Sequence, residues 1–177
     1  MIIISKMQII NGFDNLPKIM HAVATLGSYD GVHSGHQVLI NQVIARAKAR
    51  GGKSVVLTFE PHPRITLGKA EGLKLLSTIE EKALLLERLG VDYMLIIPFD
   101  LEFSRLSHQE FIESYLIEKL GIEELIGARI LLGGKTLGIQ TDGIAEPLDE
   151  CAAAVAECIG GVKTVDGMRC ADVAAVD

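Results

Sequence analysis

The sequence contains little cysteine. The 177 residues include three, Cys151, Cys158 and Cys170, and their spacing does not follow the C-x2-C pattern of zinc sites. Cys151 and Cys158 lie two helical turns apart and would share one face of a helix. Since a free cysteine behaves as a small hydrophobic residue, we expect these residues to pack in a core. A chain of this length buries roughly two-thirds of its unfolded surface and needs no disulfide or metal to fold.

Long apolar segments and an excess of positive charge are also missing. No run of 18 apolar residues occurs, and the apolar start at residues 1–4 is too short for a membrane span or a signal sequence. The 17 Lys and Arg against 23 Asp and Glu give a net charge of −6, which argues against nucleic-acid binding through a basic face. We therefore expect a cytoplasmic protein with no membrane or nucleic-acid partner, folded as one domain over residues 1–177.

What is present is an alternation of β-branched apolar runs with helical patterns. Strands are predicted at 22–26, 54–59, 93–97, 128–132 and 162–165. Helices are predicted to start near residues 36, 77, 107 and 147 and to end at the glycines near 51, 90, 121 and 160. This order predicts an α/β fold, a Rossmann-like doubly wound parallel sheet of about five strands. Ligands of such sheets bind beyond the carboxyl ends of the strands, where the strand order switches.

Two helix starts are predicted from capping boxes. Ser77 with Glu80 and Ser107 with Glu110 have the required spacing, in which a hydroxyl and a carboxylate three residues apart satisfy each other's backbone N–H groups. The charged runs 80–82 and 123–124 are interpreted as solvent-exposed faces.

The loop after the first predicted strand concentrates residues suited to phosphate. It reads Gly-Ser-Tyr-Asp-Gly-Val-His-Ser-Gly-His over residues 27–36 and leads into a helix. Its glycines allow close approach of the backbone to a ligand, and the helix N-terminus attracts anions. His33 and His36 lie at that same terminus, where imidazoles can donate hydrogen bonds to phosphate oxygens. A zinc site is disfavoured here, because the two histidines have no clear third ligand nearby; Asp30 is the one obvious choice.

Two further patterns carry weaker signals. Gly134-Lys135-Thr136 suggests a P-loop, but that motif requires a glycine at the position of Arg129. His62 lies between Pro61 and Pro63, which hold its backbone extended. From the residues alone His62 is as readily structural as functional.

These motifs resemble a known family. The run at 27–36 resembles the His-x-Gly-His signature of nucleotidyltransferases, in the wording of the adenylyltransferase module of bacterial FAD synthetase, the bifunctional riboflavin kinase/FMN adenylyltransferase. Thr58-Phe59-Glu60-Pro61-His62-Pro63-Arg64 resembles the second motif of that family. Stretches at 76–82, 89–93, 98–100 and 103–107 resemble it too, so that the likeness extends from about Gln8 to Leu125.

The resemblance implies adenylyl transfer from ATP to FMN, giving FAD and pyrophosphate. It implies Mg²⁺ bound with ATP, Asp30 at most in an outer shell, and no protein metal site. A riboflavin kinase module is absent from these 177 residues, so flavin phosphorylation is not expected. The implied catalytic residues are His33 and His36; the implied nucleotide-binding residues are Gly27, Ser28, Tyr29, Asp30, Gly31 and Gly35; and the implied flavin or phosphate contacts are His62, Pro63 and Arg64.

The C-terminal third departs from the family pattern. Residues 133–138 lack the acidic and aromatic residues of the family's loop, and Ala171, Asp172, Val173 and Val176 stand where the family has hydroxyls and an arginine. Lost phosphate contacts predict slow FAD synthesis, unless Lys135, Lys163 or Arg169 supplies the charge. Two alternatives stay open: a flavin- or adenine-nucleotide-binding protein without turnover, and a related nucleotidyltransferase with another phosphate acceptor.

Overall fold

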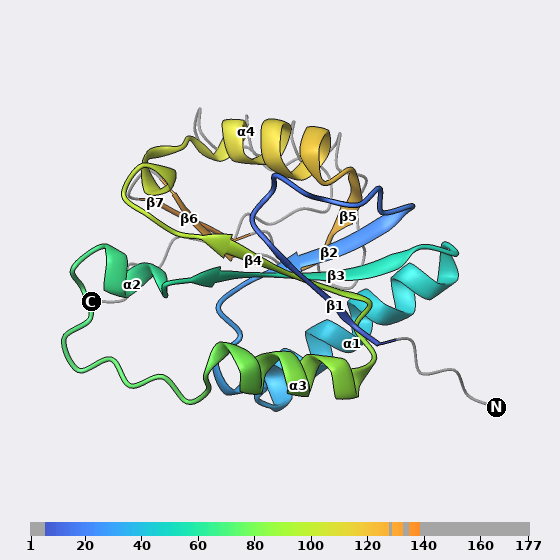
Figure 1. Cartoon of the computed structure of the whole chain (residues 1–177), viewed down its shortest axis with the longest axis horizontal. Coiled ribbons are helices and arrows are strands. Elements are labelled where there is room, and N and C mark those ends of the chain that lie inside the picture. Colours follow the sequence, from blue (N-terminus) through green and yellow to red (C-terminus); the bar gives the residue numbers. More distant parts are fainter. Residues whose placement is uncertain (1–5, 128, 133–134, 139–177) are drawn as a thin grey trace.

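A parallel sheet forms the centre of the protein. The computed structural model describes residues 6–127, 129–132 and 135–138. Five parallel strands lie in the order β1-β4-β3-β2-β5 (Figure 1). This confirms the predicted α/β doubly wound class. The strands are β1 (Gln8–Asn11), β2 (Ala22–Leu26), β3 (Lys53–Glu60), β4 (Tyr93–Pro98) and β5 (Ile122–Leu125).

Helices on both faces explain why the central strands are so apolar. Helices α1 (Ser34–Ala49) and α3 (Ile79–Leu89) cover one face, while α4 (His108–Glu110) and the π-helical segment η3 (Phe111–Lys119) cover the other (Figure 1). Every residue of β2 is buried, and so are the six central residues of β3. A strand covered on both faces does not alternate between polar and apolar residues, so it is predominantly apolar, with Thr25, Ser54 and Thr58 as the buried polar residues of β2 and β3.

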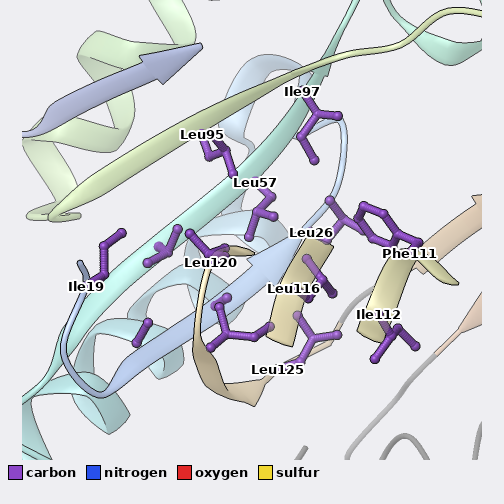
Figure 2. Close-up of a cluster of buried hydrophobic side chains, with 14 of the residues drawn as sticks. Ile19, Leu26, Leu57, Leu95, Ile97, Phe111, Ile112, Leu116, Leu120 and Leu125 are labelled. Carbon is purple, nitrogen blue, oxygen red and sulfur yellow. The ribbon is translucent and has the colours of Figure 1, made fainter. Parts of the chain in front are cut away.

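Each face of the sheet has its own hydrophobic core. On the α1 and α3 side, Ile40 and Leu86 belong to a cluster with Val56 and Met94 of the sheet. On the other side, residues of η3 such as Leu116 join Leu57, Leu95 and Ile97 of β3 and β4 (Figure 2). These two cores fix the carboxyl ends of the strands, from which the loops of the candidate site emerge.

The aromatic residues gather near those carboxyl ends. Five phenylalanines and one tyrosine form a continuous chain of ring contacts, most of them edge-to-face, with centroids 5.0–6.3 Å apart. Phe59 is the penultimate residue of β3 and Phe99 directly follows β4, so the cluster links two strand ends to η3. The members are Phe13, Phe59, Phe99, Phe103, Phe111 and Tyr115.

The strand predictions need two corrections. The predicted strand 128–132 does form, as β6 (Arg129–Leu132), but it pairs antiparallel with β7 (Lys135–Gly138) in a separate two-stranded sheet. The fifth strand of the main sheet is β5 instead, which the sequence analysis read as a charged surface. Strand β1 was also missed, because it lies at an edge and most of its residues are exposed.

Of the two predicted capping boxes, one is displaced by one residue, and the structure shows one of the two hydrogen bonds of the other. Helix α3 begins with a capping box of Thr78 and Glu81, not Ser77 and Glu80. At α4 the Ser107 hydroxyl accepts the Glu110 N–H at 3.1 Å, as predicted. The predicted helix from Pro147, the strand 162–165 and all three cysteines lie outside the described residues. No helix in the described part of the chain has the length and apolar character to span a membrane.

Candidate active site

Strand β2 is the point at which the strand order switches. From β2 the chain passes through α1 to β3 and on to β4, and then returns through η3 to β5 on the other side of β2. The connections lie on opposite faces of the sheet and diverge at the carboxyl end of β2 (Figure 1). The loop that leaves this end is residues 27–33, and such a position is where open α/β sheets bind ligands.

The backbone of this loop is contorted. Tyr29, Gly31 and Val32 all have positive φ, of 45°, 66° and 41°. A short 3-10 turn, η1 (Asp30–Val32), carries the chain from β2 to α1. A Cβ on Gly31 would come within 3.1 Å of the Leu76 Cβ, so only glycine fits without movement of the neighbouring loop.

The two predicted catalytic histidines lie together at the start of α1. His33 is the N-cap, and its Nδ1 accepts the His36 N–H at 3.3 Å. The two imidazole rings are stacked, with centroids 3.5 Å apart and planes 21° from parallel. His33 is exposed and His36 is half-buried. The loop therefore presents a pair of imidazoles beside a helix N-terminus.

The surroundings of His36 favour its neutral form. Burial lowers the pKa of His36, as do the neighbouring His33 and Lys82, while the Asp30 carboxylate opposes them. The Nδ1 atom of His36 is buried and has no hydrogen-bond partner among the described residues. The edge of the Tyr29 ring packs against His36 with centroids 5.1 Å apart. A neutral imidazole of this kind can both accept and donate a hydrogen bond.

Tyr29 lies underneath the loop rather than on its surface. Its side chain is buried, and its hydroxyl lies 2.5 Å from the Thr25 Oγ1. Burial raises the pKa of the Tyr29 phenol, although the Thr25 hydrogen bond opposes this. A Cβ on Gly27 would lie 3.1 Å from the Tyr29 ring. Tyr29 therefore shapes the predicted nucleotide-binding loop through its packing against Gly27 and His36.

Asp30 fastens the loop to the N-terminus of α3. Its carboxylate accepts hydrogen bonds from the Leu76 N–H at 2.9 Å and from the Ser77 N–H and hydroxyl at 3.0 and 3.2 Å. The same Ser77 hydroxyl accepts the Gly31 N–H at 2.8 Å. Burial would raise the pKa of Asp30, but these hydrogen bonds outweigh it and hold the pKa below its ordinary value. Ser77 is free for this role because Thr78 caps the helix.

The Lys82 side chain links the two motif segments, 27–36 and 58–64, through hydrogen bonds. Its Nζ donates to the Ser28 carbonyl at 2.5 Å and to the Thr58 Oγ1 at 3.2 Å, and the Thr58 hydroxyl lies 3.3 Å from the same carbonyl. The sequence analysis placed residue 82 on a solvent-exposed face, which is wrong: Lys82 is 6% exposed. Thr58 is fully buried beside it. A lysine that directly follows two glutamates gives no sequence signal of this burial.

The second motif forms the loop that follows β3. His62 caps the short helix α2 (Pro63–Thr66), and its Nδ1 accepts the Arg64 N–H at 3.2 Å. Burial lowers the pKa of His62, and the nearby Lys82 lowers it further. Lys82 is thus within electrostatic reach of both His36 and His62. Arg64 is exposed, and its Nε donates to the Lys69 carbonyl at 3.2 Å.

The structure therefore brings together the segments 27–36 and 58–64, at the carboxyl ends of β2 and β3, and the segment 76–82, at the start of α3. Within the described ranges, no group of three His, Cys, Asp or Glu side chains is arranged to hold a metal ion. The backbone of Lys135 lies in β7, while Lys163, Arg169 and residues 171–176 fall outside the described residues.

Comparison with known proteins identifies the family. The sequence profile described as FAD synthetase matches residues 17–153, which is more than half of the chain. The chain belongs to the FAD synthetase family. The match includes both motif loops and the helix that carries Lys82.

Curated relatives of this FAD synthetase family member share its sequence over the same region. A bifunctional riboflavin kinase/FMN adenylyltransferase of Listeria monocytogenes is 39% identical over 125 residues, which are 70% of this chain and 40% of the relative. The protein of the same name in Escherichia coli K12 is 31% identical over 164 residues, covering 89% of this chain and 52% of the relative. The chain thus spans about half the length, or less, of the curated relatives that it matches.

A solved structure shares the fold. The crystal structure of a macrolide-efflux protein from Streptococcus pneumoniae matches 69% of this chain and 42% of its own chain, with a TM-score of 0.61 and 25% identity. The efflux activity in that description belongs to that protein and is not carried over here.

Proposed function

We propose that this chain transfers the adenylyl group of ATP to FMN. An oxygen of the FMN phosphate attacks the α-phosphorus of ATP in line and forms the new P–O bond. The bond from the α-phosphorus to the bridging oxygen breaks, and pyrophosphate leaves with the electron pair. No protein nucleophile takes part, so catalysis consists of positioning and charge stabilisation. The observation that carries the proposal is the stacked pair of His33 and His36 at the switch-point loop of a FAD synthetase family fold.

The two histidines would contact the phosphates of ATP. Both stand at the N-terminus of α1, a 16-residue helix whose dipole favours anions at this end. The buried, unpartnered His36 Nδ1 shows that its hydrogen-bonding capacity is not used up by the fold. Donors placed where charge develops on the α-phosphate and on the leaving pyrophosphate lower the barrier most.

His62, Pro63 and Arg64 would contact the flavin or its phosphate. They lie after β3, next to β2 in the sheet, so the acceptor substrate would approach from the neighbouring strand end. Exposed apolar side chains adjoin the same loops: Ile65 in α2, and Leu76, which is 75% exposed, beside Gly31. An apolar surface next to a phosphate site suits a ligand that carries a flat aromatic ring.

Mg²⁺ is expected as part of the ATP substrate complex. The ion retains several water ligands in such complexes and needs few protein ligands. Asp30 uses both carboxylate oxygens to hold Leu76 and Ser77, which suits an outer-shell electrostatic role. Its contribution is to fix the loop and to add a negative charge near the metal–phosphate complex.

The proposal is tested by incubating the purified chain with FMN and Mg·ATP and quantifying FAD and pyrophosphate. The two products should form in equal amounts. Because residues 171–176 lack the family's hydroxyls and arginine, we expect a turnover below the ordinary enzyme range of about 1–10³ s⁻¹. Restoring Ser, Ser, Thr and Arg at Ala171, Asp172, Val173 and Val176 should raise turnover more than ATP affinity. Absence of FAD in both proteins would contradict the proposal.

A second candidate is binding of adenine nucleotide or flavin without turnover. The sequence of residues 171–176 favours this candidate. The loop at 27–36 can still bind a nucleotide after the contacts to the departing pyrophosphate are lost. Mg·ATP or FAD at one hundred times its Kd would then stabilise the fold by about 2.7 kcal/mol while no FAD forms. Replacing FMN by other phosphate acceptors in the same assay distinguishes a related nucleotidyltransferase from both.

A further inference from the structure

Lys82 is an unusual residue in its surroundings. It lies in the first turns of α3 and is 6% exposed, in the same helix as Ala83 and Leu86 of the hydrophobic core. Lysine is almost never fully buried unless it is paired with an opposite charge. No carboxylate of the described residues forms an ion pair with Lys82, and its two hydrogen-bond acceptors, at Ser28 and Thr58, are uncharged.

Burial of an amine without an ion pair costs free energy, so the site must provide something in return. The Lys82 pKa is lowered by burial, while the carboxylates of Asp30 and Glu60 act in the opposite direction and favour the charged form. Neither carboxylate is close enough to neutralise it. The field of a buried charge that has no direct counter-ion extends into its low-dielectric surroundings, where an anionic ligand can use it.

The two hydrogen-bond acceptors of Lys82 belong to the two segments that carry the candidate site residues. The Ser28 carbonyl belongs to the loop that carries His33 and His36, and Thr58 begins the motif that carries His62. Strands β2 and β3 are paired in the sheet, and beyond the end of that pairing the Lys82 side chain bonds to both of the segments that follow. The Thr58 hydroxyl also lies 3.3 Å from the Ser28 carbonyl, and the Gly27 N–H donates to the Leu57 carbonyl at 3.1 Å where the two segments leave the sheet.

We propose that Lys82 is a positioning residue of the adenylyl-transfer site: its buried amine ties the two motif loops together and places a fixed positive charge beneath the phosphate-binding histidines. The inference rests on the proposed function for its role in ATP binding, but its structural part stands on this geometry alone.

The charge of Lys82 also acts on the protonation of the histidines. His36 faces His33, Asp30 and Lys82, and His62 faces Lys82, Asp30, Arg64 and Glu60. Burial lowers the pKa of both, and Lys82 lowers each further. Removal of the charge should raise both pKa values, whereas a lysine that only fills space would leave them unchanged.

The decisive experiment compares wild type with Lys82→Met, Lys82→Arg and Lys53→Met in the full chain. Histidine pKa values are measured by NMR titration, and Mg·ATP affinity by calorimetry. We expect Lys82→Met to raise the pKa of His36 and His62 and to weaken Mg·ATP binding about tenfold, the size of one charge-assisted contact. Lys82→Arg should retain most of the ATP affinity. Lys53→Met removes a lysine that pairs with Asp92 at the opposite end of β3 and should leave both properties unchanged.

Unchanged histidine pKa values and ATP affinity in a folded Lys82→Met protein would overturn the proposal. If that variant does not fold, the wild type still decides: titration of His36 and His62 at or above the ordinary value of 6.5 would overturn it. Neither the histidine titration nor the measurement of ATP affinity depends on turnover. Failure of the proposed function is therefore detected separately, as the absence of FAD formation by the wild-type protein.

Discussion

The amino ends and the carboxyl ends of the parallel strands, here called the starting edge and the ending edge of the sheet, both contain buried polar residues. The two differ in whether a buried charge is paired with an opposite charge. At the edge where the strands begin, Glu124 is fully buried and its carboxylate oxygens lie 2.9 and 2.7 Å from the Nε atoms of Arg46 and Arg50. Lys53 likewise pairs with Asp92 at 2.9 Å. At the ending edge, the Lys82 amine is bonded to the uncharged oxygens of Ser28 and Thr58, and no ion pair of Lys82 occurs within the described residues.

The difference separates stability from function. A buried charge that has its counter-ion in direct contact is satisfied within the fold and has little field left for a ligand. A buried charge held by neutral groups, together with histidines of shifted pKa, is typical of a binding or catalytic site. We therefore expect substitutions at the starting edge to change the free energy of unfolding and those at the ending edge to change catalysis. The four predictions below test this contrast.

The largest effect is expected at the histidines. His33→Ala and His36→Ala should each reduce adenylyl transfer by about 10²–10³, the loss typical of one transition-state donor. Both lie at the start of a helix and neither is fully buried, so the melting temperature should change little. Steady-state FAD formation and thermal unfolding are measured on the same samples. Full activity in the double variant would show that the stacked pair is incidental.

The converse is expected at Glu124. Glu124→Gln keeps the shape of the side chain but leaves Arg46 and Arg50 without their buried counter-ion. Because both arginines reach solvent and regain hydration, we expect a loss of about 1–3 kcal/mol in the free energy of unfolding, measured with denaturant. The rate of FAD formation by the folded fraction should equal that of the wild type. A rate loss without a stability loss would break the contrast between the two edges.

A third, smaller effect is a dependence of stability on pH. The pKa values of His36 and His62 are lowered in the folded state, chiefly by burial, below the ordinary value of 6.5 that applies when the chain is unfolded. As the pH falls below about 6.5 the unfolded chain binds protons first, so the free energy of unfolding should decline. Denaturant titrations at pH 7.5, 6.5 and 5.5, chosen to bracket roughly that range, measure the slope. His36→Gln with His62→Gln should reduce it; an unchanged slope would contradict the assignment.

The smallest effect is expected at Leu76. Its side chain is largely exposed beside Gly31, so Leu76→Ala should leave stability unchanged. If the side chain supports an aromatic ring of a substrate, the KM for FMN or for ATP should rise by a factor of about 3–10, corresponding to roughly one buried methyl or two, with kcat nearly constant. Leu84→Ala, an exposed leucine on α3, is the matched control. Equal KM values in both variants would remove Leu76 from the site.

Much of the fold could be predicted because the relevant signals are local. The buried strands 22–26, 54–59 and 93–97 are continuous apolar runs, and the glycines at 90 and 121 end their helices with φ of 90° and 68°. The site loop was also found from the sequence, since its glycines and histidines lie within ten residues of one another. The roles assigned to its residues and to 62–64 stay predictions.

What the sequence did not reveal depends on partners that are distant along the chain. Residues 122–125 form a strand by pairing with β2, about 100 positions earlier in the chain, and the buried Glu124 is paired with Arg46 and Arg50, which lie 78 and 74 positions earlier. The helix start at Thr78 rather than Ser77 depends on Asp30 and Gly31, which engage the Ser77 hydroxyl.

The sequence by itself thus determined the three central strands with the helices between them, the parallel sheet and the loop that carries His33 and His36. Backbone propensity and hydrophobic period act over a few residues and are visible in any short window. Only the tertiary structure decided that Lys82 lies beneath that loop, because the burial of a charge is set by what surrounds it in space. The same long side chain would be solvated on an isolated α3, and it becomes part of the site only when β2 and β3 bring Ser28 and Thr58 to its amine.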